Sequence, residues 1–158
     1  MKNYRIELKW ALIFVAMMLG WMLLERLGGF HDARIAQHAV VTNFVAIPAI
    51  AVYVFALLDK RKNFYQGKMT YVQGLLSGLV ITLIVTALSP LTQYITSTII
   101  TPGYFSNMID YSVREGKMTA GEAANYFNLK SYIVQVLIGT PVMGLITSAV
   151  VAIFTRKK

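Results

Sequence analysis

A stretch of thirty residues without a charged side chain or histidine, residues 71–100, sets the first limit on the fold of this chain. An α-helix rises about 1.5 Å per residue, so a helix of this length exceeds the roughly 30 Å thickness of a bilayer's hydrocarbon core. Hydrophobic residues make up 56% of the sequence and charged residues 14%, which is too few charges to cover a soluble domain. We therefore predict an all-α integral membrane protein.

The apolar residues fall into four segments, which predict four transmembrane helices in a single domain, residues 1–158. We place the spans at about residues 8–27, 39–58, 71–97 and 132–154. The first span has the basic start and apolar core of a signal peptide, but no small-residue cleavage site follows it, so we expect it to be retained. Pro48 and Pro90 lie inside the second and third spans, where each removes a backbone donor and predicts a kink.

The loop at about residues 101–130 predicts a short amphipathic helical hairpin between the third and fourth spans. Thr119 and Glu122 form a capping box for its second helix. Its first helix gathers large apolar side chains on one face: Tyr104, Phe105, Met108 and Ile109. This face is a candidate contact for a partner protein or lipid. The plainer interpretation is that it lies on lipid headgroups or plugs its own bundle.

The distribution of Lys and Arg predicts the orientation, because cytoplasmic loops carry an excess of these residues. One side would hold three in the N-terminal segment, four after the second span and three at the C-terminus. The other side would hold five, mixed with five acidic residues. We therefore predict that both termini are cytoplasmic. The net charge of +8 then serves orientation and lipid headgroups, and we expect no nucleic acid as a partner.

Small residues recur at steps of four in two spans and predict where these helices pack. The candidate packing residues are Gly74 and Gly78 in the third span, and Gly144 and Ser148 in the fourth. Small residues let helix backbones approach closely in lipid. We therefore expect these two helices to pack through their small-residue ridges.

A polar cluster follows the first span and is the first candidate site: Glu25, His31, Asp32 and His38. Such residues could handle protons or hold a divalent cation. Their spacing matches no metal-binding motif, however, and Asp32 fits the N-cap of the next helix. We therefore favour a solvated interfacial loop with local ion pairs, and predict neither a bound metal nor a cofactor.

Amides inside the predicted spans form the second candidate site: Asn43, Gln73, Gln93 and Gln135. They could line a polar path or a small-ligand cavity, or they could hydrogen-bond between helices, which is the interpretation we favour. No span holds an ionisable residue at its centre, which argues against coupled ion transport. A hydrated cavity lined by these amides would favour transport or ligand binding, and a dry bundle would favour a scaffold.

Several stretches resemble a bacterial membrane family called domain of unknown function forty-one ninety-nine. They are HDARIAQHAVVTNF, GKMTYVQGLLSGLVITL, SPLTQYITSTIITPGYFSNMIDY, GKMTAGEAANYFNLKSYIVQ and TSAVVAIF, and they cover nearly the whole chain. The resemblance implies a small inner-membrane protein of Gram-negative bacteria with four spans. It implies no activity and supplies no catalytic residues.

The function class follows from what the sequence lacks. It has no cysteine, no Gly-rich phosphate loop, no nucleophile elbow and no metalloprotease motif, so we predict that the protein is not an enzyme. We expect an accessory or structural protein that acts through partner proteins or bound lipid. The alternative is a small transporter or a ligand-binding membrane protein that uses the intramembrane amides. Expected partners are membrane lipid and either a second copy or another membrane protein.

Overall fold

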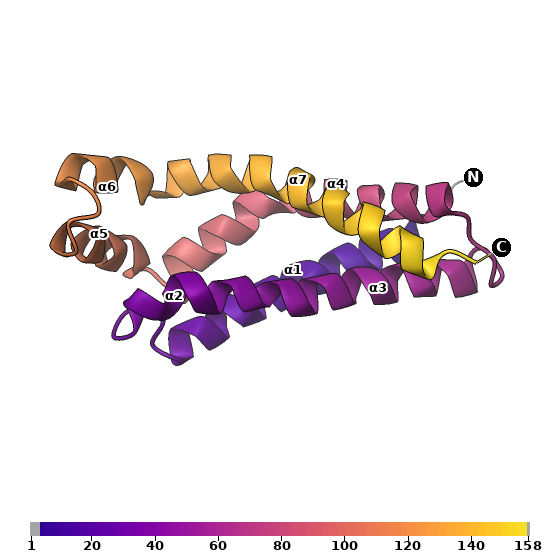
Figure 1. Cartoon of the computed structure of the whole chain (residues 1–158), viewed down its shortest axis with the longest axis horizontal. Helices are drawn as coiled ribbons and strands as arrows, with labels where there is room; N and C mark the ends of the chain where they lie inside the picture. The colour runs from indigo at the N-terminus through magenta and orange to yellow at the C-terminus, as the bar shows by residue number, and fades with distance from the viewer. Residues whose placement is uncertain (1–3, 158) are drawn as a thin grey trace.

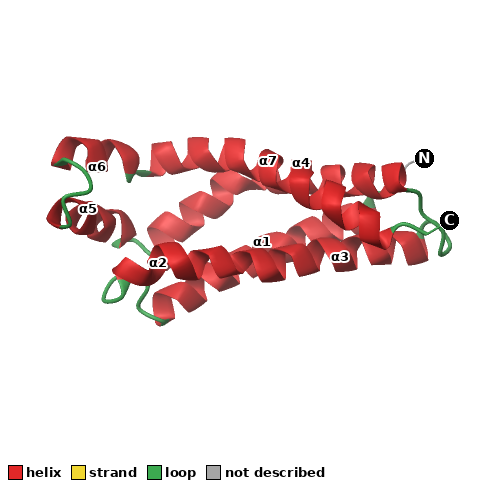
Figure 2. Ribbon diagram, viewed as in Figure 1, coloured by secondary structure: helices red, strands yellow, loops and turns green. Residues whose placement is uncertain are grey.

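The computed structural model describes residues 4–157, which form helices joined by short loops (Figure 2). The elements are α1 (Arg5–Leu27), α2 (Ile35–Val41), the 3-10 helix η1 (Thr42–Val45), α3 (Ala46–Asn63), α4 (Tyr71–Ile95), the π-helix η2 (Thr96–Ile100), α5 (Tyr104–Arg114), α6 (Ala120–Tyr126) and α7 (Leu129–Thr155). Residues 4–157 contain no β-strand, and one isolated antiparallel bridge joins Met69 to Lys157.

Four segments are long and apolar enough to cross a membrane: α1, the continuous rod of α2, η1 and α3, α4 with η2, and α7. This confirms the prediction of an all-α membrane protein with four such helices. Each segment contains the corresponding predicted span, and polar residues extend it beyond the apolar core at one or both ends.

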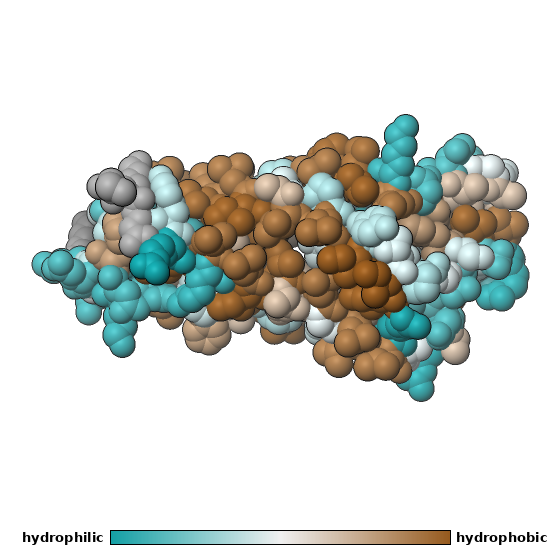
Figure 3. Space-filling view, turned by 180° about the vertical axis from the view of Figure 1, so that it is seen from behind, coloured by the Kyte–Doolittle hydropathy of each residue, from teal (hydrophilic) through white to brown (hydrophobic). Residues whose placement is uncertain are grey.

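The bundle has two distinct ends (Figure 1). We call the end where α1 begins and α7 finishes the terminal end, and the opposite end, which carries α5 and α6, the cap end. On the face drawn in Figure 3, hydrophobic residues fill the middle and hydrophilic residues gather toward both ends. Large apolar side chains such as Ile47 and Leu83 are exposed on the helices, as expected for contact with lipid.

The half of the bundle near the terminal end is tightly packed, with its core formed by side chains from all four long segments. Here α4 lies closely against α7, and a Cβ added at Gly74 would be 3.3 Å from the Cβ of Ala152. The hydroxyl groups of Tyr53 on α3 and Thr82 on α4 lie 2.8 Å apart in this core. A hydrogen bond between two neutral side chains therefore joins α3 to α4 in the core.

The two prolines inside spans change the helices locally. Pro48 cannot donate to the carbonyl of Phe44 and its ring crowds that carbonyl, and here the chain forms η1 before α3 begins. Pro90 likewise leaves the Thr86 carbonyl without its helical donor, and the hydroxyl of Ser89 donates to that oxygen at 2.8 Å. Beyond this region α4 runs away from α7 toward the end of α1 (Figure 1).

The predicted N-cap of the second span is wrong. The helix α2 begins at Ile35, its N-cap is Arg34, and no side chain caps it. Asp32 Oδ1 instead accepts from the backbone N–H of Ala33. The reason is the preceding turn, in which the amide of Arg34 donates to the carbonyl of Gly29 at 2.7 Å and delays the start of the helix.

The hairpin at the cap end forms as its sequence signals predict. Gly116 follows the end of α5 with a φ of +64°, the left-handed conformation that suits glycine after a helix. The capping box at Thr119 and Glu122 is confirmed, since each residue's side chain accepts from the other's backbone N–H.

Candidate functional site

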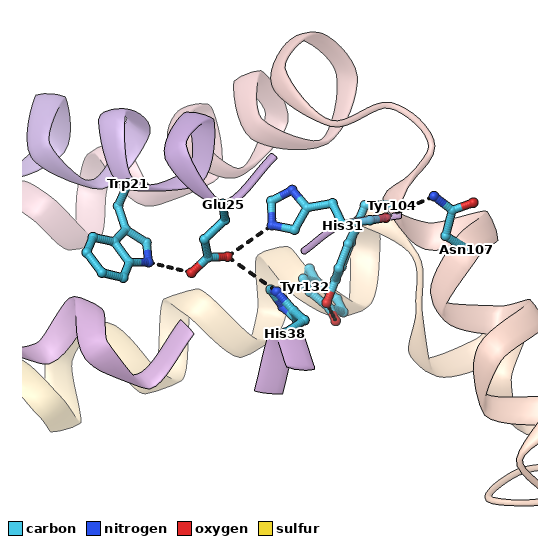
Figure 4. Close-up of polar contacts among 7 residues, drawn as sticks. All are labelled: Trp21, Glu25, His31, His38, Tyr104, Asn107 and Tyr132. Carbon is cyan, nitrogen blue, oxygen red and sulfur yellow. Dashed lines mark hydrogen bonds and ion pairs between the residues drawn. The ribbon is translucent and has the colours of Figure 1, made fainter. Parts of the chain in front are cut away.

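Three titratable side chains meet at the cap end, where α1 turns into α2 (Figure 4). Glu25 lies in the last turns of α1, His31 in the connecting turn and His38 in α2. The turn is tight because Gly29 adopts a φ of +76°, which residues with a side chain rarely adopt. The chain reversal brings His31 back beside Glu25. We call these three residues the Glu-His-His cluster.

The cluster is buried and closely spaced. Glu25 is 2% exposed and His31 is 4% exposed. His31 Nε2 lies 3.0 Å from Glu25 Oε2, and His38 Nδ1 lies 3.3 Å from the same oxygen. The indole N–H of Trp21, one turn earlier on α1, donates to Glu25 Oε1. Both oxygens of this carboxylate therefore face protein groups rather than water.

Tyr104, the first residue of α5, covers the cluster from the cap side. The centroid of its ring lies 5.2 Å from that of His31 and 5.1 Å from that of His38. Burial raises the pKa of the Tyr104 hydroxyl, which therefore stays neutral. This hydroxyl lies 3.4 Å from the hydroxyl of Tyr132 on α7. Asn107 Nδ2 donates to the backbone oxygen of His31 at 2.9 Å and holds α5 on the turn.

A cavity of about 610 Å³ lies between the long helices in the half of the bundle near the cap end. Its walls come from α1, α3, the second half of α4, η2 and α7. Its apolar wall includes Phe14, Met18, Met22, Ile50, Val136 and Met143. Its polar wall includes His31, His38, Gln93, Tyr104, Tyr132 and Gln135. The cavity therefore borders the Glu-His-His cluster.

The structure separates the predicted polar residues into those that meet at the site and those that do not. Of the predicted outer cluster, Asp32 alone lies apart and exposed. Three of the predicted amides line the cavity: Asn43, Gln93 and Gln135. The fourth, Gln73, lies in the first turn of α4, where its side chain accepts from the backbone N–H of Thr70 in a capping box.

Comparison with known proteins places the chain in a family. A family model described as protein of unknown function (DUF4199) matches residues 9–157. The chain belongs to this family. The resemblance identified from the sequence is thus confirmed. No curated protein and no solved structure matches the chain.

In this DUF4199 chain, the small-residue ridges of α4 and α7 lie against each other. A Cβ added at Gly78 would be 2.7 Å from the Cβ of Ser148, closer than side-chain carbons pack. A Cβ added at Gly144 would be 2.3 Å from the Cγ2 of Thr82. These glycines therefore occupy the contact between the two helices.

The face predicted for a partner is divided in the DUF4199 fold. Tyr104 turns onto the histidines, and the ring of Phe105 lies 5.0 Å from that of Tyr132 on α7. Met108 and Ile109 are half-buried. The first turn of α5 thus packs into the mouth of its own bundle.

Sequence analysis missed a second buried charged group, at the terminal end of the DUF4199 bundle. Glu7 Oε1 lies 2.9 Å from Lys60 Nζ on α3, and the hydroxyl of Ser77 on α4 donates to Glu7. A signal was available, since Glu7 is one helical turn before Ala11 and so shares the face that packs into the core. Glu7 precedes the segment matched by the family model, whereas the whole Glu-His-His cluster lies within it.

Proposed function

We propose that this protein is a non-enzymatic integral membrane protein that binds one uncharged amphipathic molecule, of lipid character, in the cavity near its cap end. The cavity itself carries the proposal. Its volume of about 610 Å³ lies within the range of about 300–1,000 Å³ that is usual for small-molecule sites. It also lies between the helices of a bundle, a common place for such sites.

The distribution of side chains in the cavity indicates the class of ligand. Met18, Met22 and Met143 supply flexible, polarizable walls that adapt to an irregular apolar chain. The end nearest the cap presents imidazole and phenol groups from His31, His38, Tyr104 and Tyr132. The buried carboxylate of Glu25 already contacts Trp21 through one oxygen and the two histidines through the other. These features favour a ligand with an apolar body and a neutral, hydrogen-bonding head.

This proposal moves the preferred function from partner binding toward ligand binding. The amides Asn43, Gln93 and Gln135, expected from sequence to bond between helices, border an open volume. The expected partner surface on α5 loses support because Tyr104 and Phe105 pack onto the protein's own α7. Docking of a partner protein on the rest of the cap remains the second candidate, supported by the half-exposed Met108 and Ile109.

The proposal includes a location. We infer that the protein resides in the inner membrane of a bacterium with its terminal end in the cytoplasm. The support is the concentration of Lys and Arg near that end, including Lys60, Arg61 and Lys68 between α3 and α4. The cavity and cap would then lie toward the outer face of the membrane.

A photoreactive monoacylglycerol with a diazirine in its acyl chain tests the ligand proposal. We expect ultraviolet light to crosslink it to the purified protein in detergent, with adducts mapping to peptides that contain Met18 or Met22, which are more buried than Met143. Gly139→Leu fills the cavity, since Gly139 lines it and a Cβ there meets no atom within 4 Å. We expect at least about tenfold less labelling in this variant, because the added side chain occupies the ligand's volume.

Gly20→Leu is the matched control. Gly20 is also a helical glycine with no atom within 4 Å of an added Cβ, and it lies outside the cavity wall. Labelling of this variant should equal that of the parent. Equal labelling of the Gly139→Leu and Gly20→Leu proteins, or adducts confined to lipid-facing side chains, would overturn the proposal.

A further inference from the structure

We propose that the Glu-His-His cluster is a binding site for a divalent first-row transition metal ion of the zinc class, with Glu25, His31 and His38 as protein ligands. This site shares His31 and His38 with the wall of the cavity. The inference rests on the geometry of the three side chains and is independent of whether the cavity holds an amphipathic molecule.

Two of the spacings between the three ligand atoms fit a zinc ion. Zinc binds nitrogen and oxygen ligands at about 2.0–2.1 Å, so neighbouring corners of its tetrahedron are about 3.3 Å apart. The corresponding distances from Glu25 Oε2 are 3.0 Å to His31 Nε2 and 3.3 Å to His38 Nδ1. All three ligand atoms lie within 4.8 Å of one another. This limit is wider than a tetrahedral edge, so the two imidazoles would turn toward each other around a bound ion.

A second observation is that one imidazole nitrogen of each histidine, Nδ1, is buried without a hydrogen-bond partner. His38 Nδ1 is 3.3 Å from the carboxylate but makes no hydrogen bond, because the angles are unsuitable. His31 Nδ1 is buried without a partner as well. His38 Nδ1 and Glu25 Oε2 are thus close to each other but not aligned for a hydrogen bond. Two neighbouring ligands of one metal ion have this arrangement. A bound ion would satisfy His38 Nδ1.

Charge also favours a cation here. Glu25 is 2% exposed and lies in the last turns of α1, where the helix dipole disfavours negative charge. The guanidinium of Arg26, the next residue, donates to the backbone carbonyl of Ile100 at the end of η2. A divalent ion held by one carboxylate and two neutral imidazoles would place positive charge beside the buried carboxylate.

The surroundings already hold the ligands in place, as the outer shell of a metal site does. Trp21 donates to Glu25 Oε1 and so orients the other oxygen toward the histidines (Figure 4). Asn107 fixes the backbone of His31. One carboxylate and two histidines leave one position of a tetrahedral zinc ion open. Because His31 and His38 also line the cavity, we infer that this position is reached from it.

Zinc titration of the chelator-treated, histidine-tag-free protein in detergent tests the site. We expect one zinc ion per chain by calorimetry, an increase in melting temperature, and the intense visible absorption of tetrahedral cobalt when Co²⁺ replaces zinc. Glu25→Gln, His31→Gln and His38→Gln should each weaken zinc binding by about 100-fold or more, since outer-shell changes alone cost about 10–100-fold.

Two matched variants make the outcome decisive. Asp32→Asn removes the exposed acid of the same turn and should leave zinc affinity unchanged. Gly139→Leu should lower lipid labelling at least about tenfold and retain zinc, which distinguishes metal binding from binding of the amphipathic ligand. His38→Gln is the least disruptive ligand change because His38 is only half-buried, and a protein that melts like the metal-free parent but no longer responds to zinc would support the site. Zinc binding that survives all three ligand changes, absence of stoichiometric binding, or an octahedral cobalt spectrum would overturn it.

Discussion

At the scale of single residues, the buried ion pair between Glu7 and Lys60 is the strongest constraint at the terminal end. Glu7 is 2% exposed and Lys60 is 4% exposed, so neither charge is well solvated. The Lys60 ammonium also lies 3.8 Å from the centroid of the Phe64 ring. Removing one partner of such a pair leaves the other charged and buried, which is far more costly than removing both.

We therefore predict that Glu7→Gln lowers the free energy of unfolding by about 3–5 kcal/mol. The double variant Glu7→Leu with Lys60→Met should recover most of that loss. Lys9→Met breaks the ion pair with Asp59, in which the lysine side chain is 53% exposed, and should cost less than about 1 kcal/mol. Unfolding by SDS titration in detergent micelles measures all three. A Glu7→Gln protein no less stable than Lys9→Met would show that the Glu7 site is solvated.

The residue scale is also where sequence analysis was least complete. It named Glu25, His31 and His38, because polar side chains are conspicuous after an apolar run, but it grouped Asp32 with them. Neighbours in sequence separate when a turn intervenes, and the turn at Gly29 sends Asp32 outward. It assigned no role to Glu7, although this residue lies on the face of α1 that packs into the core.

At the scale of elements, the contact between α4 and α7 organises the bundle. Gly78 faces Ser148 and Gly144 faces Thr82, so each helix presents glycine where the other presents a small hydroxylated side chain. This exchange lets the backbones approach closely along two successive turns. No large side chain could enter without forcing the helices apart.

The prediction is that even alanine is too large at these positions. Gly78→Ala and Gly144→Ala should each lower the free energy of unfolding by about 1–3 kcal/mol, the usual cost of overpacking. Gly20→Ala, with open space around its added Cβ, should be neutral or slightly stabilising because alanine favours a helix. Thermal unfolding followed by circular dichroism compares them. If Gly144→Ala melts with the parent, the two helices are farther apart than described.

Elements were predicted better than sites, for a physical reason. A long apolar run must be helical in lipid to satisfy its backbone, so α1, α4 and α7 follow almost from composition. The orientation of α5 did not follow. Its apolar face shows that α5 is amphipathic, but the sequence does not say whether the bundle, lipid or a partner covers that face. In the structure, Tyr104 packs on His31 and His38, which are far from it in the sequence.

At the scale of the whole molecule, the two ends of the bundle differ in charge and in packing. Near the terminal end, Lys60, Arg61 and Lys68 lie beside the end of α7, where Arg61 donates to the Thr155 carbonyl at 2.8 Å. The opposite half contains the cavity. The periodicity of each span could not reveal that cavity, because it arises from how far α4 departs from α7.

The whole-molecule prediction is the topology. Alkaline phosphatase fused after Lys158 should be inactive and a fluorescent protein at the same position bright, because an excess of Lys and Arg favours the cytoplasmic side of a membrane. As a control, phosphatase inserted at Gly116, in the turn between α5 and α6, should be active. The reverse pattern at the two positions would invert the orientation and place the cap in the cytoplasm.

The pairing of α4 with α7 also has a consequence for biogenesis. A ribosome delivers α4 to the membrane before it has made α5, α6 and α7, so the groove at Gly74 and Gly78 first faces acyl chains. The groove is filled only after α7 has been made and inserted. During that interval the half-built bundle offers a vacant helix-docking groove to any other nascent or resident span. A cell that makes this protein therefore has to keep neighbouring helices away from α4 until α7 arrives.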